Sequence, residues 1–434
     1  MNIYGIDLGT TNSLIGLHST GFLSEIVPSC ADITNKRAGR DLYENMSAKR
    51  SFKTDMSMGV EGTMPRAASR LVLEELARQV KDDKVKDVVI SVPAYFDDSQ
   101  RSATIDAAEQ AGLKVHGLVN EPTAAAMYIA QQRKGVYVVY DLGGGTFDVS
   151  IIDNRFGTYD VQATSGLVVG GDNFDLMLMK YFIKNAKIPF HKMNDEQRML
   201  LQHVSKQYKE MMQQLQYDFD IDFTPYGGTS MVFKKDDYVQ LMKLTFGDTI
   251  TCTLSLIRKW IPEGEVFEIY LVGGSTHCPF LQEWITEETG KRPAPLTYDP
   301  DRVVALGAAL YAHYVSTGEI NTKVSDVTKA LSIGLYDGTV SNIIPGNSKI
   351  PLSMEKMFTN PVKASSLEID LYQGESMFAK DNSKIGTLVW DFDEPVEAHC
   401  GQVIVEISVD TMGVIKFSAR ELLKAPKTIV LERS

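Results

Sequence analysis

The chain has 434 residues, 44% of them hydrophobic, and a formal net charge of −12 at pH 7. This length allows two to four domains or subdomains with hydrophobic cores of their own. The negative charge argues against a protein that binds nucleic acid or an anionic membrane surface, because both ligands attract basic proteins. No apolar run approaches the roughly 20 residues that cross a bilayer. We therefore expect no nucleic acid and no membrane among its partners.

The cysteines and the N-terminus indicate the compartment. The four cysteines lie far apart and form no Cys-x-x-Cys pair, which predicts neither a zinc site nor a disulfide framework. The chain begins with an apolar, strand-like segment that lacks the charged region and apolar core of a secretory signal. Unpaired thiols are typical of a reducing compartment, so we expect a cytoplasmic protein.

The predicted elements of the first 318 residues mix strands and helices. Residues 20–65 are polar and have no clear periodicity, so no element is predicted there. Strands are predicted over residues 1–18 (two, with a tight turn), 88–92, 136–152, 159–165 and 267–272. Helices are predicted over residues 67–81, 99–111, 195–216 and 301–314, with others beginning near residues 121, 174 and 279.

The C-terminal part has a different pattern. From about residue 331 onward, short alternating segments are separated by turn residues, which is typical of a β-sandwich of roughly 100 residues. The clearest strands are predicted over residues 366–372, 386–392, 402–410, 414–419 and 428–432. Residues 319–330 are polar and form the predicted linker.

Two acid-led turns rich in glycine and threonine are the most informative motifs. Residues 7–12 read Asp-Leu-Gly-Thr-Thr-Asn, and residues 141–148 read Asp-Leu-Gly-Gly-Gly-Thr-Phe-Asp, each between two apolar runs. Glycine lets the backbone approach a ligand closely, and concave rows of amides bind anions. One such turn could be an ordinary hairpin, but two with matching flanks predict a nucleotide held between two similar halves.

Further residues fit a nucleotide site, although each also has a plain structural interpretation. Asp7 and Asp148 are suited to hold Mg²⁺ through its waters. Residues 273–275 (Gly-Gly-Ser) end a strand before a helix, where a sugar or base often rests. Glu121 is either a group that positions water or a charge that stabilises a helix start. Composition alone makes Lys53 a surface residue.

The chain resembles the DnaK-type chaperones, the seventy-kilodalton heat-shock family of the actin/hexokinase ATPase superfamily. Sugar kinases and actins share the two turns but lack the strings at residues 92–96 and 120–126. The matching strings occur in family order over nearly the whole chain, at residues 5–13, 92–101, 120–126, 141–150, 271–276, 299–301, 331–334 and 372–375.

The resemblance implies an α/β actin-like ATPase fold. It has two lobes built from duplicated ribonuclease H-like subdomains, and a β-sandwich peptide-binding domain follows. The implied ATPase domain covers residues 1–318, and its lobe subdomains near residues 20–85 and 181–262 are short. A linker over 319–330 and a sandwich over 331–434 without a helical lid complete the expected organisation.

The resemblance also implies site residues. Those implied in catalysis are Lys53, Glu121, Thr146 and Asp148, and those implied around Mg²⁺, largely through water, are Asp7, Asp141 and Asp148. Those implied to bind ATP or ADP are Gly9, Thr10, Thr11, Asn12, Gly143, Gly144, Gly145, Thr146, Lys209, Gly273, Gly274, Ser275, His277 and Asp301. Pro93 and Arg101 match the pair that relays the nucleotide state. Leu335, Phe358, Leu367 and Ile369 would line a pocket for an extended apolar peptide, and their plain interpretation is sandwich core.

The sequence departs from the family at the adenosine end and at the linker. On the helix over the adenosine only Lys209 is kept, whereas Lys206, Glu210 and Gln213 replace the other family residues, and His277 replaces an arginine. The linker residues 323–326 are polar, which gives them little apolar surface to bury.

These observations favour an ATP-dependent chaperone with ATP/ADP and Mg²⁺ as cofactors. Its expected partners are unfolded or extended client peptides, a J-domain co-chaperone and an exchange factor. A nucleotide-sensing adaptor or scaffold with weak ATPase activity and one dedicated partner is the main alternative. A filament-forming protein like actin is a weaker one.

Overall fold

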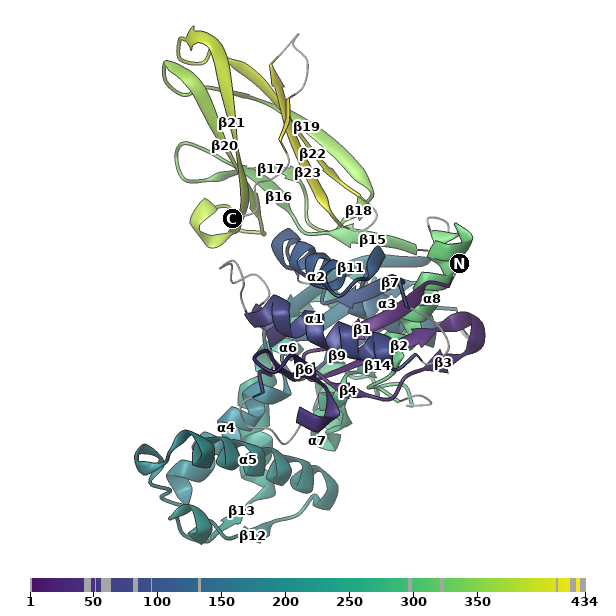
Figure 1. The fold of residues 1–434 in the computed structure, drawn as a ribbon, viewed down its shortest axis with the longest axis vertical. Coiled ribbons are helices and arrows are strands. Elements are labelled where there is room, and N and C mark those ends of the chain that lie inside the picture. The colour runs from purple at the N-terminus through teal and green to yellow at the C-terminus, as the bar shows by residue number, and fades with distance from the viewer. Residues whose placement is uncertain are drawn as a thin grey trace.

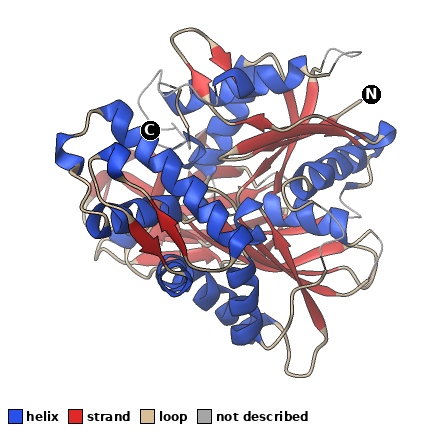
Figure 2. Cartoon of the chain, turned by 90° about the horizontal axis from the view of Figure 1, so that it is seen from below, coloured by secondary structure: helices blue, strands red, loops and turns tan. Residues whose placement is uncertain are grey.

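The computed structural model describes residues 2–42, 48–50, 52–55, 64–80, 85–94, 96–131, 134–295, 299–320, 324–410, 413–421 and 427–429. Figure 1 shows a central body of sheets and helices, a helical part below it and a set of long strands above it. Sheets lie inside the central body and helices cover them (Figure 2). Among the described residues, no helix is both long and apolar enough to cross a membrane.

The first sheet carries the first turn. Its strands are β1 (Tyr4–Leu8), β2 (Asn12–Leu17), β3 (Phe22–Leu23), β4 (Val27–Pro28), β7 (Asp87–Val92) and β8 (Lys114–Asn120). The strand order is β3-β2-β1-β7-β8, with β4 paired to β2. Helices α1 (Met64–Arg78) and α2 (Asp98–Gln110) pack on this sheet and bury apolar side chains with it.

The second sheet repeats this plan around the second turn. Strands β9 (Val136–Leu142) and β10 (Phe147–Asp153) form the hairpin, as β1 and β2 do in the first sheet. β14 (Phe267–Val272) lies parallel to β9, just as β7 lies parallel to β1. The full strand order is β14-β9-β10-β11-β15-β18. The duplication predicted from the two turns is therefore present in the strand pairing.

Two helices join the sheets. Helices α3 (Glu121–Ile129) and α8 (Val303–Thr317) share a hydrophobic cluster with side chains from both sheets. Gly307 of α8 packs on α3 so closely that a Cβ there would lie 1.7 Å from the Ala124 carbonyl oxygen. A larger side chain at position 307 would therefore push the two helices apart.

A helical part extends from the second sheet. It contains α4 (Gly171–Asn185), α5 (Asp195–Leu215), α6 (Lys235–Trp260) and α7 (Pro279–Thr289), with the short hairpin β12 (Phe219–Ile221) and β13 (Met231–Phe233). Asn194 and Gln197 form a reciprocal cap at the start of α5. The predictions near residues 174, 195–216 and 279 are confirmed, whereas the 26-residue helix α6 was not predicted.

The C-terminal strands form two four-stranded antiparallel sheets. One contains β16 (Leu331–Gly334), β17 (Val340–Ile344), β20 (Ala364–Gln373) and β21 (Ser383–Val396). The other contains β19 (Leu352–Thr359), β22 (Gln402–Val409), β23 (Ile415–Glu421) and β24 (Lys427–Ile429). Both contribute to one hydrophobic cluster, in which Trp390 and Phe417 are among the larger side chains. The sequence patterns predicted β20 to β23 and the described part of β24, whereas residues 430–432 of that last prediction lie outside the described residues. They did not predict β16, β17, β18 or β19.

The polar segment predicted as a linker contains a strand. β15 (Val324–Thr328) pairs in parallel with β11 (Tyr159–Leu167) and antiparallel with β18 (Ser348–Ile350). The second sheet therefore continues through this segment to the C-terminal strands, as Figure 1 shows. Backbone pairing needs no apolar side chains, which explains why the composition of the segment did not predict it.

Candidate functional site

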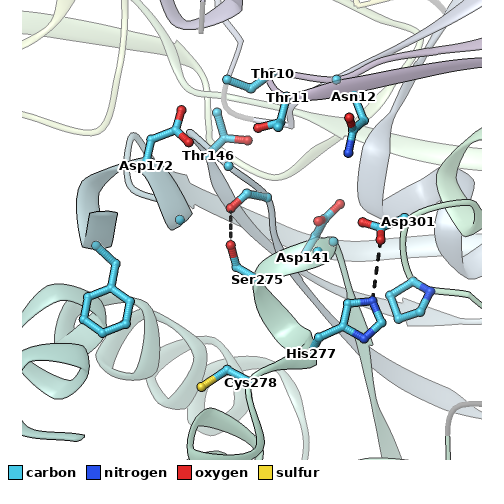
Figure 3. A pocket seen from close by; sticks show the side chains of 18 of the residues that line it. Thr10, Thr11, Asn12, Asp141, Thr146, Asp172, Ser275, His277, Cys278 and Asp301 are labelled. Atoms are coloured by element: carbon cyan, nitrogen blue, oxygen red, sulfur yellow. Dashed lines mark hydrogen bonds and ion pairs between the residues drawn. The ribbon is translucent and has the colours of Figure 1, made fainter. Parts of the chain in front are cut away.

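A cavity of about 370 Å³ lies between the two turns. Figure 3 shows its lining side chains converging from both halves of the chain. Of the residues predicted from the sequence, the cavity is lined by Asp7, Gly9, Thr10, Thr11, Asn12, Glu121, Asp141, Gly143, Gly144, Thr146, Lys209, Gly273, Gly274, Ser275, His277 and Asp301. Tertiary folding thus brings together sixteen residues that span almost 300 positions.

The first turn is held by a close approach within its own backbone and by hydrogen bonds from Ser29, a residue outside the motif. A Cβ on Gly9 would lie 2.1 Å from the Asn12 carbonyl oxygen, so no larger residue fits there. The Ser29 hydroxyl donates to the Gly9 carbonyl oxygen at 2.7 Å, and the Ser29 amide donates to the Thr11 carbonyl oxygen at 2.7 Å. Ser29 belongs to the polar region without periodicity, which explains why sequence reasoning missed it.

The two turns nearly touch. A Cβ on Gly144 would lie 1.9 Å from the Thr11 hydroxyl oxygen, so glycine is required where the second turn faces the first. The Thr11 hydroxyl is buried and has no hydrogen-bond partner among the residues that the structure describes. A buried polar group without a partner is costly, so this hydroxyl favours a ligand with polar atoms between the turns.

Helix α4 begins against the second turn. The amides of Gly171 and Asp172 donate to the carbonyl oxygens of Gly143 and Gly144 at 3.0 and 2.7 Å. A Cβ on Gly170 would lie 2.4 Å from the Gly144 carbonyl oxygen, so the glycine at position 170 allows the helix to start this close to the turn. The helix also brings Asp172, Phe174 and Asp175 to the cavity wall. In the sequence, only the glycine pair at residues 170–171 pointed to a turn and helix start at these lining residues.

Three carboxylates from separate elements meet at one end of the cavity. Asp7, Glu121 and Asp141 all line it. Burial raises the pKa of Asp7 to about 7, the negative charge of Glu121 adds to this effect, and Lys53 and a 2.8 Å hydrogen bond from Ser91 oppose it. Burial, followed by the charges of Glu121 and Asp7, also raises the pKa of Asp141 well above its ordinary range. Such mutual repulsion is relieved by a bound cation, and Mg²⁺ prefers carboxylate ligands of this kind.

Lys53 lies beside these carboxylates. Its ammonium forms an ion pair with Glu121, and only 2% of its side-chain surface is exposed. The interpretation of Lys53 as a surface residue, based on composition alone, is therefore wrong. The ammonium also lies 5.8 Å from the centre of the Phe96 ring, within cation–π range. A lysine that is almost fully buried requires a charged partner, and Glu121 provides it.

Asp148 is placed differently from the other acidic residues. Its side chain is 1% exposed, and its Oδ1 accepts a hydrogen bond from the Ala94 amide at 2.9 Å. It is not among the residues that line the cavity, and neither is Gly145. Asp148 is the second residue of β10, the strand that leaves the second turn, and it pairs with Asp141 of β9.

The other end of the cavity is built from residues 273–275 and α5. Gly273 has a φ of 83°, and the Ser275 hydroxyl donates to the Gly143 carbonyl oxygen at 2.8 Å. His277 Nε2 lies 3.5 Å from Asp301 Oδ2, and the hydrogen bond with Asp301 raises the pKa of His277 (Figure 3). Lys206, Glu210 and Gln213 complete the wall.

Lys209 is engaged within the protein. Its Nζ lies 2.6 Å from Asp175 Oδ1 and 3.4 Å from the Gly171 carbonyl oxygen. Burial raises the pKa of Asp175, and the Lys209 ammonium opposes this effect. Lys209, the residue of this helix that was expected to bind nucleotide, therefore already has a carboxylate partner.

Pro93 and Arg101 lie outside the cavity. Arg101 donates to the Phe96 carbonyl oxygen at 3.3 Å and to Asn120 Oδ1 at 2.6 Å. Asn120 immediately precedes Glu121, and Pro93 immediately precedes Ala94, whose amide binds Asp148. Arg101 is therefore linked through Asn120 to the neighbour of Glu121, and Pro93 is linked through Ala94 to Asp148.

The four residues predicted to bind peptide have different environments. Leu335 is 40% exposed, whereas Ile369 is 3% exposed and belongs to the cluster between the two C-terminal sheets. Phe358 and Leu367 are partly buried against the same cluster.

Comparison with protein-family models gives a match over most of the chain. The model described as Hsp70 protein matches residues 47–432, which include the second turn, residues 273–275, the polar segment and the C-terminal sheets.

Proposed function

This chain belongs to the Hsp70 family of ATP-dependent chaperones, within the actin-like ATPase superfamily, and we propose that it hydrolyses ATP to control the binding of extended apolar segments of client proteins. The observation that carries this proposal is the cavity between the two facing glycine turns, with three carboxylates and a buried lysine at one end. Family membership suggests the general activity, and the contacts below support the individual roles.

The triphosphate would lie between the two turns. The amides of residues 9–12 and 143–146 and the hydroxyls of Thr10, Thr11 and Thr146 would bind its oxygens. Glycine at positions 9 and 144 leaves room for this approach, and the Thr11 hydroxyl lacks a partner in the described part of the chain. The nucleoside would occupy the end formed by residues 273–275, His277 and Asp301.

Asp7 and Asp141, with Asp148, would hold Mg²⁺ largely through water. Asp7 and Asp141 fit this role because their burial and mutual repulsion favour a nearby cation. A bound Mg²⁺ would offset the negative charge that the phosphates add to this end of the cavity.

Hydrolysis would depend on Lys53 and Glu121. The carboxylate of Glu121 is suited to orient a water molecule toward the last phosphate, because it lines the cavity. The ammonium of Lys53 would hold Glu121 in place and stabilise negative charge that develops on the phosphate oxygens. Thr146 would contact the same phosphate from the second turn.

The remaining residues would transmit the nucleotide state. We propose an ATPase domain over residues 1–318, a linker over 319–330 and a β-sandwich that binds peptide over 331–434, with Leu335 at the pocket. Pro93 and Arg101 would connect the acidic residues to the C-terminal sheets. A J-domain co-chaperone and an exchange factor would act on this cycle in the cytoplasm.

One observation favours a second function. Because Lys209 is paired with Asp175, the adenosine end would offer the nucleotide fewer free cations. A nucleotide-sensing adaptor with slow hydrolysis and one dedicated protein partner is compatible with such a site.

A single experiment distinguishes the two functions. ATP turnover of the full chain is measured with and without a panel of unfolded peptides that differ in apolar content. Stimulation by apolar peptides supports the chaperone, whereas turnover that no peptide changes supports the adaptor.

A further inference from the structure

Two loops that are hydrogen-bonded to each other form the wall of the cavity at its nucleoside end. One loop, residues 273–277, follows β14, and the other, residues 299–302, precedes α8. The Gly273 amide donates to the Pro300 carbonyl oxygen at 3.3 Å. A Cβ on Gly274 would lie 2.8 Å from Asp301 Oδ1, so glycine there lets the Asp301 carboxylate rest against the first loop. The backbone therefore brings side chains of both loops to one place.

His277 comes from the first loop, at the end of the short helix η6 (Gly274–His277). The hydroxyl and the amide of Thr276 both donate to the Gly273 carbonyl oxygen, at 2.7 and 3.0 Å. The Gln282 side chain donates to the Thr276 carbonyl oxygen at 2.9 Å. These hydrogen bonds fix the turn that presents His277, and its imidazole faces the Asp301 carboxylate (Figure 3).

Asp299 comes from the second loop, two residues before Asp301. Its Oδ1 accepts a hydrogen bond from the Asp301 amide at 3.0 Å, and the Arg302 Nε lies 3.2 Å from its Oδ2. One possible ligand atom from each of His277, Asp299 and Asp301 lies within 4.8 Å of the other two. An imidazole and two carboxylates from two separate loops therefore converge on one point.

The spacing of these atoms is close to that around a bound metal ion. Zn²⁺ binds imidazole nitrogen and carboxylate oxygen at about 2.0–2.2 Å in a tetrahedron, which places two donor atoms roughly 3.4 Å apart. His277 Nε2 and Asp301 Oδ2 are already 3.5 Å apart. The Asp299 side chain is 46% exposed, so it has room to rotate toward them. An imidazole among the ligands favours Zn²⁺ or a related transition metal over Mg²⁺, which prefers oxygen ligands.

The charges at this point also suit a cation. The hydrogen bond with Asp301 raises the pKa of His277, so a proton already bridges the imidazole and the carboxylate. A metal ion bound there would take the place of that proton, because imidazole must be neutral to bind a metal. Arg302 meets only one oxygen of Asp299, which leaves further lone pairs on this carboxylate for an ion.

We propose that His277, Asp299 and Asp301 bind a divalent transition-metal ion of the Zn²⁺ class at the nucleoside end of the cavity. Three protein ligands would leave the fourth position of a tetrahedral ion to water. The ion would cross-link the loops that carry residues 273–277 and 299–302. Because His277 and Asp301 line the cavity, the ion and its water would occupy space that a nucleoside needs, so the two ligands would compete. Only this competition rests on the proposed function.

The first test needs no nucleotide. Zn²⁺ binding to the full-length protein is measured by titration calorimetry in the presence of Mg²⁺. We expect His277→Asn and Asp299→Asn each to lower the Zn²⁺ affinity at least tenfold, since even the loss of an outer-shell partner commonly costs that much. His191→Asn, at an exposed histidine of η4 (Phe190–Lys192), is the matched control and should bind Zn²⁺ as the wild type does.

A second pair of imidazoles provides the competing explanation. The rings of His18 and His313 lie 5.0 Å apart, so His18→Asn is titrated as well. Loss of Zn²⁺ binding in His18→Asn but not in His277→Asn would overturn the proposal, and so would a wild type that binds no Zn²⁺. The melting temperature of each variant without metal checks that it is folded.

The second test measures competition with adenosine, which has no phosphates that could bind Zn²⁺ themselves. Saturating Zn²⁺ is expected to lower the adenosine affinity of the wild type at least tenfold and to leave that of Asp299→Asn unchanged. Asp299 is not among the residues that line the cavity, so its replacement leaves the nucleoside end intact. Adenosine affinity in the wild type that Zn²⁺ does not change would refute this position of the ion. Absence of adenosine binding without Zn²⁺ would count against the proposed nucleotide site, whereas the Zn²⁺ titrations would still decide the metal site.

Discussion

The ammonium of Lys53 and the carboxylate of Glu121 form an ion pair that is almost completely buried. They are far apart in the sequence, and they meet where β8 ends and α3 begins. A charge pair removed from water is costly unless each partner compensates the other. Its location beside Asp7 and Asp141 therefore points to chemistry rather than to stability.

Replacement of Lys53 tests the role of this pair. Lys53→Ala is expected to leave ATP bound but to slow its hydrolysis about 100-fold or more, as the loss of one transition-state donor does elsewhere. Single-turnover hydrolysis and equilibrium nucleotide binding are the measurements, with the exposed Lys114→Ala as the control. Hydrolysis at the wild-type rate in Lys53→Ala would remove Lys53 from the mechanism.

The stability of the nucleotide-free protein should depend on pH through Asp7. Its pKa in the folded protein, about 7, lies above the value of 3.8 expected without the fold. The folded state therefore binds the proton more tightly, and its stabilising effect is complete below about pH 4 and lost as the pH rises through 7.

Thermal unfolding between pH 4 and pH 8 measures this effect. Asp7→Asn should make the melting temperature less dependent on pH over this range, whereas Asp381→Asn, at an exposed position, should not. Addition of Mg²⁺ with ADP should stabilise the wild type most near pH 8, where Asp7 is charged. A wild-type profile that Asp7→Asn leaves unchanged argues against the buried acidic cluster.

Gly170 should be essential for the contact between α4 and the second turn. Gly170→Ala places a Cβ against backbone atoms of Gly144 and Gly145, which cannot move without displacing the turn. We expect at least a tenfold loss of nucleotide affinity, about 1.4 kcal/mol.

Gly247→Ala is the matched control for this variant. Gly247 lies within α6, and no atom of the other described elements lies within 4 Å of its hypothetical Cβ, so alanine there should stabilise the helix by about 1 kcal/mol or less. Nucleotide titrations and urea unfolding of both variants are the measurements. Equal nucleotide affinity in the two would show that the second turn tolerates displacement.

The exposure of the predicted peptide residues allows binding to be separated from folding. Leu335→Asp, at a residue 40% exposed, is expected to reduce the affinity for apolar peptides at least tenfold with little loss of stability. Ile369→Asp, within the shared cluster, should instead unfold the C-terminal sheets, because it buries an unpaired charge. Val389→Asp, at an exposed strand position, is the control for added charge. If Leu335→Asp binds peptides as the wild type does, the pocket lies elsewhere.

The sequence determined the parts of the site that depend on local chemistry. The glycines of the two turns permit backbone approaches that larger residues exclude, and apolar runs on both sides predict the hairpins that present them. The repetition of this unit was enough to predict the duplicated architecture. Local sequence patterns similarly predicted α5 and most of the strands β20 to β24, because those signals involve near neighbours.

Only the tertiary structure decided how distant groups meet. Composition alone made Lys53 a surface residue, whereas the fold buries it against Glu121. Ser29 supports the first turn from a region with no recognisable pattern. The polar segment forms strand β15 because its backbone finds two partner strands, which no side-chain pattern records. Such contacts join residues far apart in the chain, so their energy depends on packing and backbone geometry rather than on local sequence.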